Sequence, residues 1–263
     1  MFDSQQICNS IYSCQRTFLE QQDRKDGPWE HDLPTKTLFD SLTDVLADVP
    51  DLIERVIRNT SLSEVLIANI QAENSVLQMQ LLGLLQNLGT LHDAWKTKCP
   101  TAKWPVKSES APKMKKADMI SPIPPFDDVF YFEDMWRAND FCIYKVALIL
   151  TLLLLQEVAG PQVVNSVLLK MFPNNPSYSI QSLASFICRS AEYLTFDIHN
   201  SRGYIIFTFP ATIAYMVLDK NSPEASYLYD ICSLNADSSG YGFGGAALDQ
   251  VTPLTIWVER CKA

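Results

Sequence analysis

Three polar residues open an otherwise apolar stretch of the chain: Asp134, Arg137 and Asn139. Arg137 can pair with Asp134 across one helical turn, which is a common arrangement on a helix surface. If the three side chains instead point inward, they would orient a ligand in an apolar cavity. Trp136 and Tyr144, which flank and follow this group, are candidate lining residues for such a cavity.

A second group of polar side chains is expected on one later helix and comprises Arg189, Glu192 and Tyr193. Arg189 and Glu192 have the spacing of a plain ion pair between neighbouring turns. The alternative is a polar rim on the same cavity, with His199, beside Asp197, near its mouth. The candidate ligand-binding residues are therefore Asp134, Trp136, Arg137, Asn139, Tyr144, Arg189, Tyr193 and His199, and the interior cavity would be lined by Trp136, Tyr144, Tyr193 and Phe209.

Other patterns that often carry chemistry are weak in this chain. The segment FDDVFYFED supplies Asp127 and Asp128, but Phe130 and Tyr131 stand where the magnesium motif of class I terpene cyclases needs a third carboxylate. The three histidines are isolated and lack metal-ligand spacing. The sequence predicts neither a metal site nor a cofactor, and it identifies no catalytic residue.

Helices must position these side chains, because the chain has few glycines and long segments rich in Leu, Ile and Ala. We predict an all-α fold, a multi-helix bundle-like domain built around a buried apolar helix at 126–157. The run Val146–Leu155 is too short to span a membrane, which needs roughly 20 apolar residues. Residues 204–219 read as a kinked helix around Pro210, although 205–209 also fit a strand.

The expected organisation has five segments. Residues 1–34 form an N-terminal helical extension, and 35–99 contain a helix ended or kinked by Pro50 and then a long helix that starts with a capping box at Ser61–Glu64. Residues 100–125 are a loop rich in Pro and Lys, 126–245 form the C-terminal helical core, and 246–263 are a loosely structured tail. Segments 35–245 are expected to make one domain.

Charge and cysteine content restrict the partners and the compartment. The net charge is -9 and the pI is about 4.8, which opposes binding to nucleic acid phosphates. Seven scattered cysteines and the absence of a signal peptide in MFDSQQICNS indicate a protein of the reducing intracellular compartments, nucleus or cytoplasm.

Five blocks in order resemble the C-terminal regulatory regions of fungal binuclear zinc-cluster transcription factors. They are FEDMWRANDFCIYKVALILTLLLL at 132–155, ICRSAEYL at 187–194, FTFPATIAYMVL at 207–218, SPEASYLYDIC at 222–232 and SSGYGFG at 238–244, and LHDAWKTKCP at 91–100 resembles the end of the preceding helix. The resemblance covers about residues 62–245, and it implies an all-helical regulatory domain.

The DNA-reading module of that family is missing here, because it needs six closely spaced cysteines near the N-terminus and only Cys8 and Cys14 lie there. The chain is either cut from a longer protein or a stand-alone product, and its start at Met1 favours the second. Three functions remain open: a ligand-sensing or regulatory module of secondary metabolism that binds a small apolar metabolite or a protein partner, a cofactor-independent cyclase or isomerase, and a purely structural product.

Overall fold

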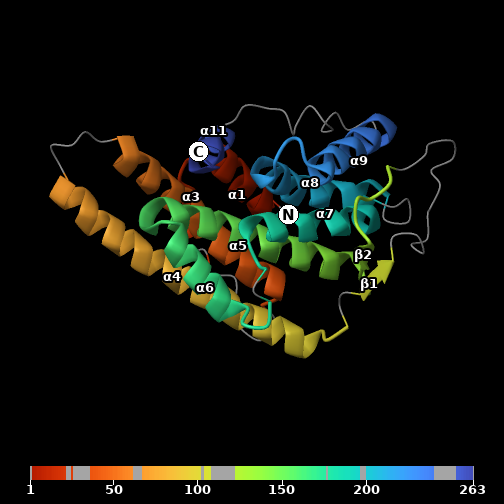
Figure 1. The fold of residues 1–263 in the computed structure, drawn as a ribbon, viewed down its shortest axis with the longest axis horizontal. Helices are drawn as coiled ribbons and strands as arrows, with labels where there is room; N and C mark the ends of the chain where they lie inside the picture. Colours follow the sequence, from red (N-terminus) through yellow and green to blue (C-terminus); the bar gives the residue numbers. More distant parts are fainter. Residues whose placement is uncertain are drawn as a thin grey trace. The chain divides into compact units, whose positions relative to one another are not determined.

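The computed structural model describes residues 2–21, 25, 36–61, 67–101, 104–107, 122–175, 177–195, 200–239 and 253–262. Helices dominate these ranges, and the only strands within them form one two-stranded sheet (Figure 1). The predicted all-α fold class is confirmed. The predicted capping box at 61–64 falls largely outside the described residues, as does His199.

The chain divides into two compact units. Unit 1 comprises residues 1–95, 147–179 and 251–263, and unit 2 comprises 96–146 and 180–250. The boundary between the units falls inside one continuous helix, α5 (Met135–Ala159). Each unit is described separately below.

Unit 1 contains α1 (Phe2–Ser13), the 3-10 helix η1 (Phe18–Glu20), α3 (Leu38–Ser61), most of α4 (Ile67–Lys98), the second half of α5, α6 (Pro161–Met171) and α11 (Pro253–Lys262). Helix α1 packs on both α3 and α11, so segments from far apart in the sequence are neighbours. Helix α11 corrects the prediction of a loosely structured tail. Leu254, Trp257 and Val258 are buried on it, and an apolar face of this kind stabilises a short helix.

Helix α3 continues past Pro50, so the stop that the sequence allows at this residue does not occur. Proline in a helix interior costs roughly 3 kcal/mol, because it removes a hydrogen bond and crowds the preceding turn. Buried apolar residues continue on both sides of it, namely Leu42, Val45, Leu46, Val49, Leu52, Ile53 and Val56, and their burial outweighs that cost. The helix starts with a reciprocal cap: Asp40 N donates to Thr37 Oγ1 at 3.2 Å, and Thr37 N donates to Asp40 Oδ2 at 2.9 Å.

The predicted break between α5 and α6 is confirmed at Gly160 and Pro161. Gly160 has a φ of 83°, which glycine adopts without strain, and its amide closes the last turn on Gln156 O at 2.9 Å. Pro161 occupies the first turn of α6, where a missing N–H is harmless. Helix α5 is long and apolar enough to cross a membrane, but 83% of its most apolar window is buried, as expected of the core helix of a soluble protein.

Unit 2 contains the antiparallel strands β1 (Trp104–Lys107) and β2 (Asp128–Tyr131), the first half of α5, α7 (Ile180–Thr195), α8 (Asn200–Val217) and α9 (Pro223–Ser239). In the strand register, Val106 faces Val129 and Lys107 faces Asp128. These strands differ from the sequence prediction, which has a loop at 104–107 and helix from 126. Val129 and Phe130 are buried on β2, and that burial fixes an extended conformation that helical periodicity does not indicate.

Helix α7 is central to unit 2, since it packs on α8, α9 and β2, and α8 packs on α9 (Figure 1). The strand alternative for 205–209 is wrong, because these residues belong to α8 and Pro210 lies inside that helix. Helix α9 begins as predicted, with Pro223 in its first turn and Ser222 Oγ accepting from Ala225 N at 3.2 Å. These contacts bring residues 126–145, 186–193 and 227–232 into one unit.

Candidate functional site

The polar residues that open α5 have different environments. Asp134 caps the helix, because its Oδ1 accepts from Arg137 N at 2.9 Å, and the two side chains are 4.0 Å apart at an exposed position. The alternative of ordinary helix-surface polarity therefore fits Asp134 and Arg137. Trp136 is 58% exposed, which removes it from any interior lining. Asn139, by contrast, is buried.

Arg189 on α7 forms its ion pair with a different partner from the predicted one. Its Nη1 lies 2.8 Å from Asp128 Oδ1 on β2, rather than pairing along the helix with Glu192. Its guanidinium carbon lies 5.3 Å, 5.6 Å and 6.0 Å from three ring centroids, those of Phe126, Phe130 and Phe186 respectively. Contacts of this length are within cation–π range. Arg189 therefore ties α7 to β2 through both its charge and its flat face.

Lys145 on α5 is a second cation in an aromatic setting, and it directly precedes the apolar run Val146–Leu155. The side chain is 3% exposed. Its Nζ lies 5.1 Å from the Phe141 ring centroid, 5.2 Å from that of Phe186 and 5.3 Å from that of Tyr144. The sequence does contain a signal for this burial, because the lysine lies inside a stretch that is apolar on every helical face. Lysine is almost never fully buried without a partner, so a lysine at such a position is noteworthy.

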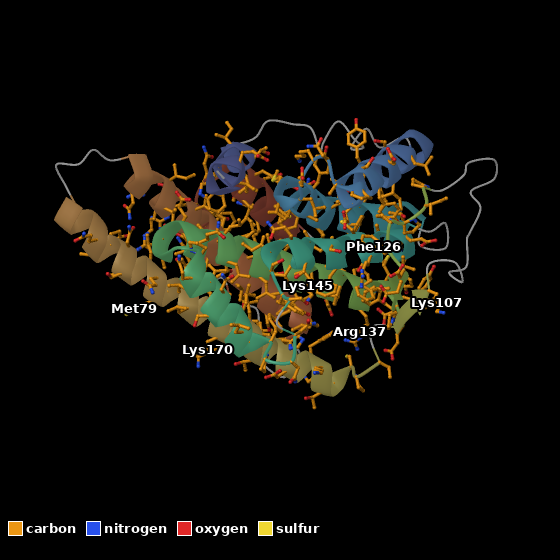
Figure 2. All side chains as sticks on the ribbon, in the orientation of Figure 1. Met79, Lys107, Phe126, Arg137, Lys145 and Lys170 are labelled. Atoms are coloured by element: carbon orange, nitrogen blue, oxygen red, sulfur yellow. The ribbon has the colours of Figure 1, made fainter. Side chains whose placement is uncertain are left out.

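The two cations belong to one group of side chains, which we call the aromatic–cation cluster and which consists of Lys145, Arg189, Phe126, Phe130, Phe141, Tyr144 and Phe186. Phe186 is shared by both cations, and the Phe130 ring contacts those of Phe141 and Phe186 at 5.7 Å and 5.9 Å. Lys145 and Phe126, labelled in Figure 2, mark its contributions from α5 and from the segment before β2. The predicted residues Tyr144 and Arg189 thus meet within it.

A second group adjoins α7 and combines phenols with a buried carboxylate. We call Tyr131, Glu192 and Tyr227 the phenol–carboxylate cluster. Burial raises the pKa of the Tyr131 and Tyr227 hydroxyls above the ordinary value of 10, and the negative charge of Glu192 raises both further. These phenols therefore remain protonated at neutral pH. Glu192 is 7% exposed, and its carboxylate supplies acceptors beside them.

Tyr193 lies near this second cluster. Its ring packs edge-on against the Tyr131 ring at 5.7 Å and contacts the Phe132 ring at 5.4 Å. Burial raises the pKa of its hydroxyl, and the charge of Asp134 adds to the shift. Tyr144, Tyr193 and Phe209 are buried as an interior lining requires, and Trp136 is the departure from that predicted set.

Three thiols of unit 2, those of Cys142, Cys188 and Cys232, are not activated nucleophiles. Burial raises the pKa of Cys142 and of Cys232 to about 12, and it raises that of Cys188 as well. The nearby Ser190 hydroxyl and the charge of Lys145 lower the pKa of Cys142 and only partly oppose the effect of burial. Nucleophilic cysteines need a lowered pKa. Among the described residues, no group of three His, Cys, Asp or Glu side chains could hold a metal ion.

Unit 2 therefore concentrates buried donors, acceptors and cations among aromatic rings. Comparison of the chain with family models, with curated proteins and with solved structures finds no match.

Proposed function

We propose that this chain is a fungal transcription-factor-like regulatory domain that senses a small apolar metabolite of secondary metabolism, in the nucleus or cytoplasm, and that does not bind DNA by itself. The proposal extends the ordered resemblance to the regulatory regions of zinc-cluster proteins. A protein partner that couples the sensed signal to transcription would follow from the same role.

The strongest support is that two of the segments that resemble the transcription-factor family pack against each other in unit 2. The block at 132–155 supplies Phe132 and Cys142, and the block at 187–194 supplies Ser190 and Tyr193. The Phe132 and Tyr193 rings are 5.4 Å apart, and the Ser190 hydroxyl lies close enough to the Cys142 thiol to affect its pKa. Residues shared with a family of sensors would be expected to shape one common interior, and these blocks do pack together.

Charge supports the exclusion of direct DNA binding. The net charge of -9 repels phosphates, and of the Lys-rich segment 103–116 the structure describes only residues 104–107, where Lys107 is exposed. Specific DNA readers concentrate Lys and Arg on one face, whereas Lys145 and Arg189 are directed into aromatic surroundings.

Gene deletion followed by transcript and metabolite profiling tests the proposal. A regulator predicts that transcripts of a set of biosynthetic genes fall or rise together and that their products change accordingly. An intermediate that accumulates while those transcripts stay normal would contradict the proposal. Complementation with an Arg189→Ala variant, compared with an exposed Arg137→Ala variant, then connects the phenotype to unit 2.

The phenol–carboxylate cluster favours one alternative, a cofactor-independent cyclase or isomerase. A buried carboxylate can act as a general base, and a phenol that stays protonated can donate a hydrogen bond to negative charge that develops on an apolar substrate, so Glu192 and Tyr227 favour this chemistry. The accumulating intermediate described above would be its expected signature. Incubation of that intermediate with the purified chain and with a Glu192→Gln variant would then separate turnover from binding.

A further inference from the structure

Helix α4 of unit 1 has an exposed face that carries no charge. Its opposite face is buried through Leu77, Leu81, Leu85 and Leu88. Between Glu73 and His92 the sequence contains no Asp, Glu, Lys or Arg. A surface helix normally carries charged residues on the side away from the core, as α3 of the same unit does with the exposed pair Glu54 and Arg58. The outer face of α4 therefore differs from an ordinary solvated helix face.

The exposed residues of this face repeat with the spacing of a coiled-coil seam. Steps of four and three residues alternate along them, and they are Ala72, Val76, Met79, Gly83, Gln86 and Thr90. We call this set the neutral stripe. Met79, labelled in Figure 2, is 66% exposed, and Val76 is 41% exposed. Alternating steps of this kind align side chains for packing against one other helix, here over a length of about 27 Å.

Gly83, in the middle of the neutral stripe, has no purpose in the packing of unit 1. A glycine in a helix interior costs roughly 0.5–1 kcal/mol relative to alanine. A Cβ added at Gly83 would meet nothing within 4 Å, and the backbone there has no positive φ. The fold of the chain itself would therefore accept a larger residue. Glycine does allow a second backbone to approach closely, so it indicates a neighbour outside the chain at this point of the stripe.

Charge favours a second copy of the chain as that neighbour. The net charge is -9, so two copies repel each other in general. At a two-fold axis each patch meets itself, and a charged patch would therefore face its own sign. The neutral stripe avoids this repulsion, and the Gln86 amide both donates and accepts hydrogen bonds. A basic partner would instead be recognised through carboxylates, which the stripe does not contain.

The ends of α4 favour an antiparallel arrangement of the two copies. Lys96 and Lys98 lie in its last turn, and a parallel pair would bring both basic ends together and align the two helix dipoles. In an antiparallel pair, the large side chain of Met79 can lie over Gly83 of the other copy. The same register places Ala72 opposite Thr90 and Val76 opposite Gln86.

We propose that two copies of this chain associate through the neutral stripe, as an antiparallel pair of α4 helices in which Met79 of each copy packs over Gly83 of the other. The contact of two single helices is at the low end of protein interface areas, so the dimer is weak and reversible. This proposal does not depend on the sensing function.

Sedimentation velocity of the purified full chain, over a range from about 1 to about 300 µM, tests the proposal. We expect a monomer–dimer equilibrium with a dissociation constant on the order of 10 µM. Met79→Glu places a carboxylate on each side of the axis and should raise that constant at least about tenfold. Ile256→Glu on α11 adds the same charge at a residue that is 62% exposed, and it should change the constant less than about twofold.

Two outcomes of this measurement would overturn the proposal. A wild-type chain that remains monomeric at the highest concentration would mean that a different molecule, or solvent alone, covers the neutral stripe. A dimer that Met79→Glu weakens no more than Ile256→Glu does would mean that the copies associate through another face.

Gly83→Gln separates close approach from charge, because it fills the open space with an uncharged residue that favours helix. Its melting temperature, measured where all chains are monomers, should equal or exceed that of the wild type. Its dimer should dissociate at least about tenfold more readily, because the added side chain holds the helices apart. Unchanged dimer affinity would contradict the proposed packing. A lowered melting temperature would also contradict it, since Gly83 would then serve the packing of unit 1 itself.

Discussion

Charged side chains of unit 1 pair with each other at or near the surface, whereas two cations of unit 2, Lys145 and Arg189, are surrounded by aromatic rings. Along α3, Arg55 lies 2.6 Å from Glu73 and Arg58 lies 3.0 Å from Glu54, with each pair partly exposed. In unit 2, the structure records three buried charged residues, Asp140, Lys145 and Glu192, and none of the charged residues described in unit 1 is buried to that degree.

This difference shows which unit contains charges whose burial costs free energy of folding. Exposed pairs contribute about 0–1 kcal/mol each and are interchangeable. Burying a charge costs several kcal/mol, and replacing a buried pair by apolar residues is often neutral or stabilising. The ion pairs of unit 1 are therefore of the weak, partly exposed kind that is common on protein surfaces. Unit 2 keeps charges that stability alone does not require, and that is a reason to look for function there.

The largest contrast is expected at alkaline pH. The thiols of Cys142 and Cys232 have an ordinary pKa of 9.0 that burial raises to about 12. Their contribution to stability is complete below about pH 9 and is lost as the pH rises towards 12, because only the unfolded chain ionises. Each loses about 1.4 kcal/mol per pH unit, so raising the pH from about 9 to about 10.5 should remove on the order of 4 kcal/mol.

Unit 1 also has two thiols of raised pKa, the half-buried Cys8 (about 12) and the buried Cys14 (about 11). Burial raises the pKa of one described phenol in unit 1, Tyr178, and of four in unit 2, namely Tyr131, Tyr193, Tyr204 and Tyr227. Alkylation followed by peptide mass spectrometry should therefore detect Cys232 at a lower pH than Cys14. Exposure of both thiols at the same pH would show that the two units do not differ in this respect.

Substitutions of Lys145 sharpen the comparison at a single residue. Lys145→Ala should cost about 3 kcal/mol or more in the free energy of unfolding, because it removes three ring contacts and leaves a cavity. Lys145→Met keeps most of the volume without the buried charge, and we expect it to cost about 1 kcal/mol or less. Urea unfolding measures both variants.

Arg58→Ala on α3 is the matched surface control, and a change below about 0.5 kcal/mol is expected because the pair is exposed. A Lys145→Met variant as unstable as Lys145→Ala would mean that the ammonium itself is required for folding. The burial of Lys145 would then be explained by stability alone and would give no reason to expect a function at this position.

The smallest effect concerns the shape of the cation. Arg189 and Arg55 both form ion pairs at partly buried positions, but only Arg189 has ring contacts recorded in the described structure. Arg189→Lys should cost about 1 kcal/mol, because lysine cannot stack a flat guanidinium on the rings. Arg55→Lys should cost about half as much or less. Thermal unfolding compares the two, and equal costs would show that the rings contribute nothing beyond the ion pair.

Structural features that depend on residues close together in the chain are predictable from this sequence. Helical periodicity identified the fold class, the buried helix and the break at Gly160, because each depends on neighbouring residues. The strand at 128–131 was missed because its extended form depends on pairing with 104–107. The partner of Arg189 was missed for the same reason, since Asp128 is 61 positions away in the chain. Tyr227 and Glu192 likewise come from different helices, and no spacing rule connects them.

The packing of α1 on α11 has a consequence for biosynthesis. These helices span residues 2–13 and 253–262, so unit 1 cannot be completed until residues 253–262 have left the ribosome. Unit 2 draws only on residues 96–250 and can close earlier. Until α11 arrives, helix α1 lacks one of the helices that it packs against. Nascent chains that stall before residue 253 would therefore expose apolar surface to chaperones and proteases. The cell could recognise unfinished copies by this exposed surface.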